Sequence, residues 1–175
     1  MTNNKQTVIA KDLANKKLKV VREFAAPLEQ VWKAWTESNL LDLWWAPKPW
    51  KAKTKSMDFR EGGFWLYCME GPDGTQSWAR ADFQTIVPQK SFTAVDSFCD
   101  ENGNKNADFP SMHWKNEFNS ISSGTKVEIE ISFTDEADMT KILEMGFEEG
   151  FTAALGNLDE LFLNQFSTGA EKVVS

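Results

Sequence analysis

The chain has few of the side chains that metal, redox and hydrolytic chemistry require. Its 175 residues include two cysteines, one histidine and one tyrosine, and no Cys-x-x-Cys pair. Two cysteines cannot build the disulfide framework of a small secreted domain, and one histidine argues against a zinc or copper site. The sequence also lacks the Gly-rich phosphate loop and the dinucleotide-binding fingerprint. We therefore expect no metal and no cofactor, and two free thiols in a reducing compartment.

Basic residues and long apolar runs are also scarce. The chain has 19 Lys and Arg against 26 Asp and Glu, a formal net charge of −7. Nucleic acids and anionic membranes select for an excess of positive charge, so we expect neither as a partner. No apolar run approaches the ~20 residues that cross a bilayer, and residues 1–16 lack the apolar core of a signal peptide. The sequence predicts a cytoplasmic protein.

Aromatic residues, in contrast, are abundant. The chain has eight Trp and thirteen Phe, although its hydrophobic fraction of 41% and charged fraction of 26% are ordinary for a globular protein. So much aromatic surface must line either a large core or a cavity. The length predicts one domain. We place it at residues 17–166, between a flexible N-terminal arm (1–16) and a flexible tail (167–175).

Alternating and helical patterns give the order of the elements. Leu18, Val20, Arg22 and Phe24 share one face of a first strand, and two short helices follow within residues 27–44. A bulge in either of the strands 76–87 and 91–99 would reverse which side chains point inward, and the sequence leaves this open. The six strands predicted after the helices are 50–59, 64–70, 76–87, 91–99, 111–121 and 125–133.

The last element is predicted to be one long helix. Apolar residues recur at three- and four-residue spacing from 136 to 164. The apolar face of the strands has no other cover of sufficient length. The predicted fold is therefore α+β with the order β-α-α-β6-α, a curved antiparallel sheet of seven strands wrapped round this helix. Gly146 and Gly150 on the apolar stripe indicate either packing room or a tolerated bend.

Five segments resemble a known family: APLEQVWKAWTESNLLDLWWAP (26–47), MDFREGG (57–63), GPDG (71–74), FQTIVPQ (83–89) and SGTKVEIEISF (123–133). In this order they look like the activator of heat shock protein 90 ATPase homologue family. That family belongs to the START-like, birch-pollen-allergen (SRPBCC, helix-grip) superfamily. The resemblance implies the helix-grip fold, with a hydrophobic cavity between the seven-stranded sheet and the helix. It implies no particular reaction, because one scaffold serves many functions.

A small hydrophobic molecule is the partner that the inward-facing residues favour. Apolar side chains with a few polar groups are typical of a ligand pocket. Asn116 would orient a ligand or hold a water, because a buried amide needs a hydrogen-bond partner. Arg22 needs an inward acid such as Asp96, or a ligand carboxylate. The predicted ligand-binding residues are Arg22, Trp65, Tyr67, Met69, Trp114, Asn116, Phe118, Leu143, Phe147 and Phe151.

Outward-facing positions give two further predictions. Phe64 and Leu66 alternate with the inward residues of their strand, so they would form an exposed apolar patch. Such patches favour self-association, and we expect a possible homodimer through the strand at 64–69. His113 lies on the polar face of its strand, which places it at the surface and argues against a Ser-His-Asp triad.

Three functions are compatible with these features, in order of preference. The first is a module that binds a small hydrophobic molecule between the sheet and the C-terminal helix. The second is a cyclase- or dehydratase-like enzyme using the same cavity, with Arg22, Asp96 and Tyr67 as candidate acid–base groups. The third is a stress- or chaperone-associated interaction module. It ranks last because the co-chaperone that gives the family its name has an extra N-terminal chaperone-binding domain, which sixteen polar residues do not supply.

Overall fold

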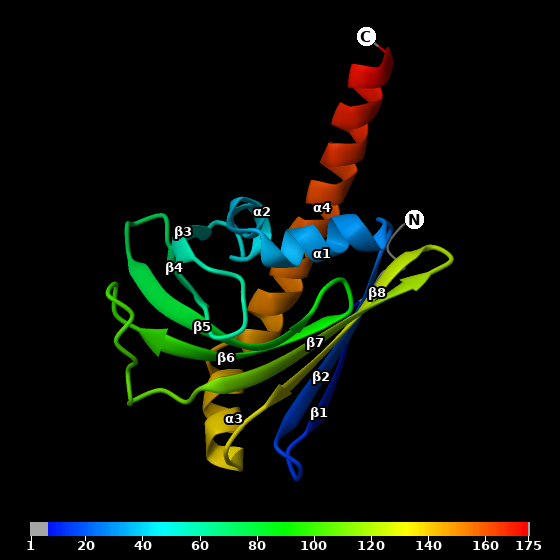
Figure 1. Ribbon diagram of the computed structural model, residues 1–175. Coiled ribbons are helices and arrows are strands. Elements are labelled where there is room, and N and C mark those ends of the chain that lie inside the picture. The colour runs from blue at the N-terminus through cyan, green and yellow to red at the C-terminus, as the bar shows by residue number, and fades with distance from the viewer. Residues whose placement is uncertain (1–6, 175) are drawn as a thin grey trace.

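The structure is a computed structural model that describes residues 7–174, with side chains described through residue 164. Its elements run in the order β-β-α-α-β6-α-α (Figure 1). The seven predicted strands and both short helices are present. The bounds of the elements are β1 Val8–Asp12, β2 Lys17–Phe24, α1 Leu28–Thr36, α2 Ser38–Trp44, β3 Lys51–Met57, β4 Phe64–Glu70, β5 Gln76–Val87, β6 Ser91–Cys99, β7 Met112–Ile121, β8 Gly124–Ser132, α3 Glu136–Glu144 and α4 Phe147–Val174.

The strands form one antiparallel sheet of eight, in the order β1-β2-β8-β7-β6-β5-β4-β3. The prediction of seven strands was wrong, because β1 lies in the segment expected to be a loose arm. Most side chains of β1 are exposed, so its sequence carries no apolar alternation. Backbone pairing with β2 holds it at the edge of the sheet, with Val8 opposite Val21. Residues 1–6 and 175 lie outside the described residues.

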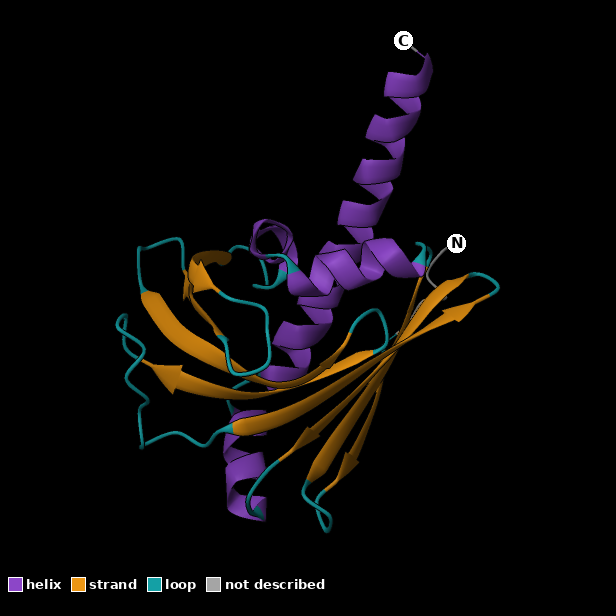
Figure 2. Cartoon of the chain, in the orientation of Figure 1, coloured by secondary structure: helices purple, strands orange, loops and turns teal. Residues whose placement is uncertain are grey.

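The apolar residues of the central strands lie on the concave face of the sheet. The predicted alternation is confirmed in β2 and β8, where Leu18, Val20, Ile129 and Ile131 are fully buried. Helices α1, α2 and α4 lie on this side of the sheet (Figure 2). An antiparallel sheet with one apolar face requires such a cover. The core is therefore a layer between the sheet and these helices.

The C-terminal helix is broken where the sequence predicted a continuous one. The carboxylate of Asp135 caps α3 by accepting a hydrogen bond from the backbone N–H of Asp138 at 2.8 Å. Gly146 has a φ of +87°, a conformation that glycine adopts without a steric penalty. α4 then begins at Phe147 and continues through 167–174, where a flexible tail was expected. None of the described helices is long and apolar enough to cross a membrane.

Aromatic packing and hydrogen bonds hold α4 across the sheet. Phe162 packs edge-on against Phe24 of β2, with ring centroids 5.7 Å apart. The side-chain amide of Asn157 donates to the backbone carbonyl of Ala46 at 2.9 Å, just after α2. Helix α2 packs against α4 as well. The first half of α4 is thus fixed on both sides, while its last turns extend beyond the sheet (Figure 1).

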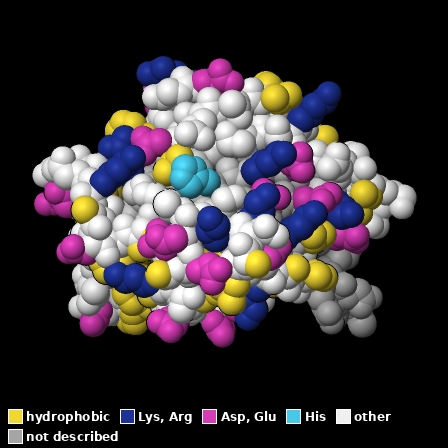
Figure 3. Space-filling model, turned by 90° about the horizontal axis from the view of Figure 1, so that it is seen from below, with side chains coloured by type: hydrophobic (Ala, Val, Ile, Leu, Met, Phe, Trp, Pro, Cys, Tyr) yellow, Lys and Arg dark blue, Asp and Glu magenta, His cyan; other side chains and the backbone are white. Residues whose placement is uncertain are grey.

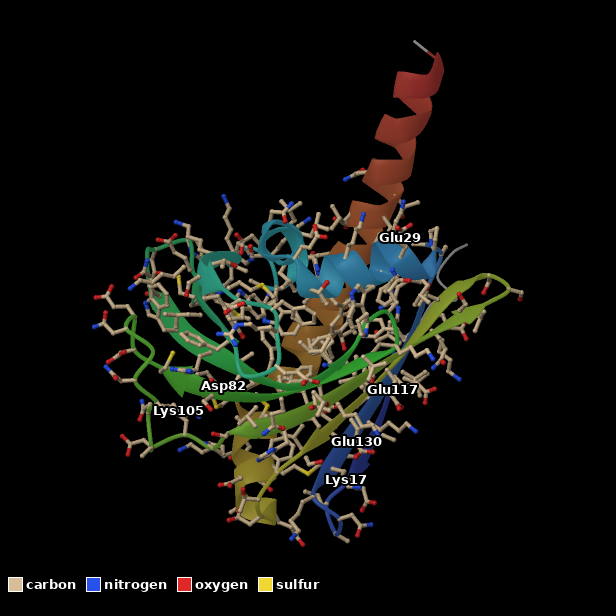
Figure 4. The ribbon with its side chains drawn as sticks, in the orientation of Figure 1. Lys17, Glu29, Asp82, Lys105, Glu117 and Glu130 are labelled. Carbon is tan, nitrogen blue, oxygen red and sulfur yellow. The ribbon has the colours of Figure 1, made fainter. Side chains whose placement is uncertain are left out.

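The outer face of the sheet is charged. Lys and Arg side chains are interspersed with Asp and Glu when the molecule is seen from below, and the histidine lies at the surface (Figure 3). The expected exposure of His113 is confirmed. Lys17 of β2 and Glu130 of β8 form a cross-strand pair at 3.4 Å (Figure 4). Charges on this face keep it in water, while the concave face buries the apolar residues.

The predicted apolar patch on the outer face of β4 is covered, so the prediction that it is exposed was wrong. Leu66 is only 5% exposed. The guanidinium of Arg80 lies 4.1 Å from the ring centroid of Phe64 and donates to the carbonyl of Gly103 at 2.9 Å, in the loop after β6. β4 also has a paired strand on each side. The homodimer through 64–69 stays a prediction without the patch that motivated it.

Gly124, at the start of β8, offers a test of how closely the sheet approaches the chain before α1. Its φ is +143°, and a Cβ here would lie 2.0 Å from the backbone oxygen of Phe24. We expect Gly124→Ala to lower the free energy of unfolding by about 3 kcal/mol or more, measured by urea denaturation. Gly74→Ala is the control, because Gly74 also has positive φ but a Cβ there would meet no atom within 4 Å. It should cost only about 1–2 kcal/mol, and equal losses would contradict the close approach.

Candidate functional site

A pocket of about 230 Å³ lies between the concave face of the sheet and the junction of α3 with α4. Strands β4 to β7 form its floor, and Trp45 and Pro47, which follow α2, close one side. The pocket reaches the surface beside Met145, which is 51% exposed. Its lining is mostly apolar and rich in aromatic rings. The aromatic lining residues are Trp45, Tyr67, Phe98, Trp114, Phe147 and Phe151.

Small residues on both walls leave this space unfilled. In the sheet, Ala79 of β5 lies between Tyr67 of β4 and Phe98 of β6. On the helical side, Gly146 and Gly150 line the pocket without a side chain to fill it. Protein interiors normally leave few voids larger than a water molecule. The pocket is therefore lined by an alanine on the sheet and by two glycines on the helical side, while the neighbouring positions carry large rings.

One acidic side chain, Asp96, faces the pocket. The register places it on β6 between Ala81 of β5 and Met112 of β7, which are both buried on the concave face. Its Oδ1 is buried and has no hydrogen-bond partner among the described residues. Burial, and then the negative charge of Asp82, raise the pKa of Asp96 to about 7, while the backbone N–H of Ser97 lowers it by less. Near neutral pH this carboxyl therefore exists in both protonation states.

Tyr67 is the other ionisable group in the lining. Trp45 Nε1 donates to its hydroxyl oxygen at 3.1 Å, and its ring stacks on Trp65 with centroids 3.9 Å apart. Burial, and then the charge of Asp96, raise the pKa of Tyr67 well above its ordinary value, so the hydroxyl stays protonated. No Lys, Arg or His belongs to the lining that the structure describes. Over the same described residues, no three His, Cys, Asp or Glu side chains gather as a metal site.

The pKa of Asp96 has a consequence for stability. Folding raises this pKa from 3.8 to about 7, so between these pH values the folded protein holds a proton that the unfolded chain has released. The contribution of the group to stability is complete below about pH 4 and is lost as the pH rises to 7. We therefore compare the free energy of unfolding of Asp96→Asn with that of the unsubstituted protein, measured by urea denaturation. The difference in favour of the variant should grow by about 2–3 kcal/mol from pH 5 to pH 8.

Asp73→Asn is the control for this titration. Asp73 is exposed, and hydrogen bonds from Thr75 lower its pKa instead of raising it. The difference in the free energy of unfolding between Asp73→Asn and the unsubstituted protein should stay constant from pH 5 to pH 8. An Asp96→Asn protein that keeps a constant difference from the unsubstituted one over this range would contradict the raised pKa.

A second, smaller pocket of about 40 Å³ continues from the first along the sheet. The two share Trp45, Tyr67, Asp96 and Trp114 in their linings. Asn116 lines the smaller one, and its Oδ1 has no hydrogen-bond partner among the described residues. Two acceptor oxygens without a partner among the described residues, on Asp96 and Asn116, therefore belong to one connected region.

Seven of the ten predicted ligand-binding residues line one of these two pockets. Phe118 lines neither, because it packs into the core with its ring centroid 5.1 Å from that of Trp32 and 5.8 Å from that of Trp35. Leu143 packs against the core from α3 and lines neither pocket. The seven lining residues are Trp65, Tyr67, Met69, Trp114, Asn116, Phe147 and Phe151.

Sequence reasoning did not include Asp96 or Trp45 among the ligand-binding residues. The signal for Asp96 was available, because Phe92, Ala94 and Asp96 alternate along β6 and share its inward face. Trp45 ends the helical run of α2, and periodicity alone does not say where a side chain at a helix end points. Its contact with the Tyr67 hydroxyl depends on how α2 crosses the sheet.

Arg22 lies away from both pockets and pairs with α4. Its guanidinium forms an ion pair with Asp159 and donates to Thr7 Oγ1 at 2.9 Å. The side chain is 6% exposed; burial lowers the pKa of Arg22, and the charge of Asp159 raises it by less. The expectation that Asp96 would be its partner was wrong, because α4 brings a carboxylate to the edge of the sheet where Arg22 lies.

This ion pair is expected to stabilise the packing of α4 on β2. Asp159→Asn leaves the guanidinium buried without its counter-charge, so we expect a loss of about 2–3 kcal/mol in the free energy of unfolding. The figure is below that of a fully buried pair because Asp159 is 35% exposed. Glu160→Gln is the control, since Glu160 pairs with Lys48 in an exposed position and should change stability by under about 1 kcal/mol. Comparable losses in the two variants would refute the expectation.

A curved antiparallel sheet closed by a C-terminal helix, with a pocket between them, defines the helix-grip class. The chain belongs to the family of activator of Hsp90 ATPase homolog 1-like proteins, whose model matches residues 25–162. The predicted family is thus confirmed.

Solved structures of bacterial proteins share the fold. Protein Ms6760 from Mycobacterium smegmatis is 29% identical, with a TM-score of 0.82 over 89% of this chain and 95% of that one. A protein from Arthrobacter aurescens is 32% identical, with a TM-score of 0.82 over 87% of this chain and 88% of that one. Protein NE0264 from Nitrosomonas europaea is 27% identical, with a TM-score of 0.75 over 88% and 98% of the two chains. A search of curated proteins found no match.

Proposed function

We propose that the protein binds a small hydrophobic molecule in the pocket between the sheet and the α3–α4 junction. The observation that carries the proposal is an aromatic-lined space of about 230 Å³ with few polar groups on its wall. A cavity of about 150 Å³ lined by apolar side chains is enough to bind benzene. The space therefore suits a molecule with one or two rings, or a short alkyl chain of similar volume.

The mouth and the wall of the pocket support reversible binding. Met145 at the mouth is flexible and apolar, so it can move aside without breaking a hydrogen bond. The break at Gly146 ends α3 beside the pocket, so the two helices can shift independently. Two of the polar groups in the lining, the carboxyl of Asp96 and the hydroxyl of Tyr67, would fix the orientation of the ligand.

Acid–base catalysis on the bound molecule is the second candidate function. The pKa of Asp96, raised to about 7, supports it, since an acid of this pKa can give or take a proton at neutral pH. Tyr67 stays protonated and would act only as a hydrogen-bond donor. This candidate ranks below binding because the described lining holds a single group that titrates near neutral pH. Chaperone activation depends on the family name alone, and no contact or surface described above supports it.

A pair of glycine substitutions on α4 tests the binding proposal. Gly150 lines the pocket, where a Cβ would lie 3.7 Å from Pro47, and Gly150→Leu would fill part of the space. Gly156→Leu makes the same change six residues later on α4, where a Cβ meets no atom within 4 Å. The probes are three neutral compounds, 2-phenylethanol, 1-naphthalenemethanol and 1-decanol, and binding is measured by isothermal titration calorimetry.

We expect at least one probe to bind the unsubstituted protein, and Gly150→Leu to weaken its binding by about tenfold or more. Gly156→Leu should bind with unchanged affinity. Circular dichroism and the melting temperature show whether each variant is folded. Equal affinities of the two variants, or no binding of any probe to the unsubstituted protein, would overturn the proposal.

A further inference from the structure

The carboxyl of Asp96 is the charged group of the described pocket lining, and the binding of a purely apolar molecule would leave it without a counter-charge. Its Oδ1 is buried and makes no hydrogen bond to any described residue. The ionisable groups around it are Tyr67 on β4, Asp82 on β5 and Cys99 on its own strand. None of these is a cation, and the residues that line the pocket from α3, α4 and β7 carry no charge.

No cation among the described residues compensates this carboxylate inside the pocket. Arg80 lies on the opposite face of the sheet, where it pairs with Asp82 at 2.6 Å and donates to Gly103. Lys105 also pairs with Asp82 on that face, at 3.5 Å (Figure 4). Arg22 is held by Asp159 at the far end of the sheet. A partly buried carboxylate without a counter-charge is costly, and either a proton or a cationic ligand group would lower that cost.

We propose that the ligand is a small hydrophobic amine whose ammonium group pairs with Asp96 while its apolar part packs among the aromatic rings. The inference rests on the binding function proposed above. An ammonium group would satisfy Oδ1 and neutralise the carboxylate at once, whereas an alcohol would supply only a neutral hydrogen bond. A ligand carboxylate would be repelled by Asp96. The rings of Trp45, Trp114 and Phe147 line the same space, and aromatic rings attract cations through the π electrons of their faces.

Three probes of matched shape test the charge preference: 2-phenylethylamine, 2-phenylethanol and phenylacetate. Binding is measured by isothermal titration calorimetry at pH 8, where Asp96 is a carboxylate and the amine is still mostly protonated. We expect the amine to bind at least about tenfold more tightly than the alcohol, and phenylacetate to bind most weakly. An alcohol or phenylacetate that binds as tightly as the amine would overturn the inference.

Asp96→Asn removes the charge and keeps the shape of the side chain. We expect the variant to bind the amine no more tightly than the alcohol, while its affinity for the alcohol stays within about threefold of the original. Asp73→Asn, at an exposed turn outside the pocket, is the matched control and should keep the preference for the amine. A preference that survives in Asp96→Asn would place the ammonium group elsewhere and overturn the inference.

A pH series on the unsubstituted protein gives the same test without a variant. Pairing with the ammonium requires the carboxylate, so the affinity for the amine should fall as the pH drops below 7, by up to about tenfold per pH unit, until it reaches that of the alcohol, which stays constant. A constant affinity for the amine from pH 5 to pH 8 would overturn the inference. If none of the three probes and none of the neutral compounds binds, the binding function itself fails. If the alcohols bind and the amine gains nothing, only the choice of an amine fails.

Discussion

The structure depends on one constraint: the apolar concave face of the sheet must be covered, and α4 is the long element that covers it. Leu155 and Leu158 of α4 are fully buried against that face. Hydrophobic burial of this kind is proportional to area and has no preferred direction, so it does not by itself fix the position of the helix. The position is fixed by Asn157 at the carbonyl of Ala46 and by the Arg22–Asp159 ion pair.

The same constraint explains why the pocket lies at one end of α4. Where α4 carries Leu155, Leu158 and Phe162, the space to the sheet is closed by side chains. Near its beginning, Gly146, Gly150 and Ala79 of the sheet line the same space, and no described side chain fills it. The rings around the gap are held by one another and by the core, so they do not collapse into it. The pocket is therefore part of how the helix and the sheet fit together.

Two charged residues on the concave face, the buried Arg22 and the partly buried Asp96, have opposite environments. Arg22 forms an ion pair with Asp159 of α4 and a hydrogen bond with Thr7, which immediately precedes β1. Asp96 is partly buried close to a second negative charge, Asp82. No cation among the described residues compensates its charge. Charges buried for structural reasons are paired within the protein. The lack of a cationic partner for Asp96 is the observation on which the proposed amine ligand rests.

Features of the fold that have a local cause in the sequence could be predicted, and features that depend on distant residues could not. The strand β8 was predictable because Val127, Ile129 and Ile131 alternate with charged residues, and alternation alone decides which side is buried. The strand β1 was not predictable, because its side chains are mostly exposed and show no alternation. It is a strand because its backbone pairs with β2. In β5 a bulge between Phe83 and Thr85 shifts the register and changes which later residues face inward, an irregularity that side-chain alternation does not locate.

The candidate site divides in the same way. The aromatic inner face, the order of the main elements and the family could all be read from the chain, since each depends on residue types at fixed spacing. The partner of Arg22, the contact of Trp45 with the Tyr67 hydroxyl and the helix residues that line the pocket together with Asp96 could not. These three depend on which strands and helices become neighbours. Contacts between residues distant in the chain leave no periodic signal, so they are known only once the chain is folded.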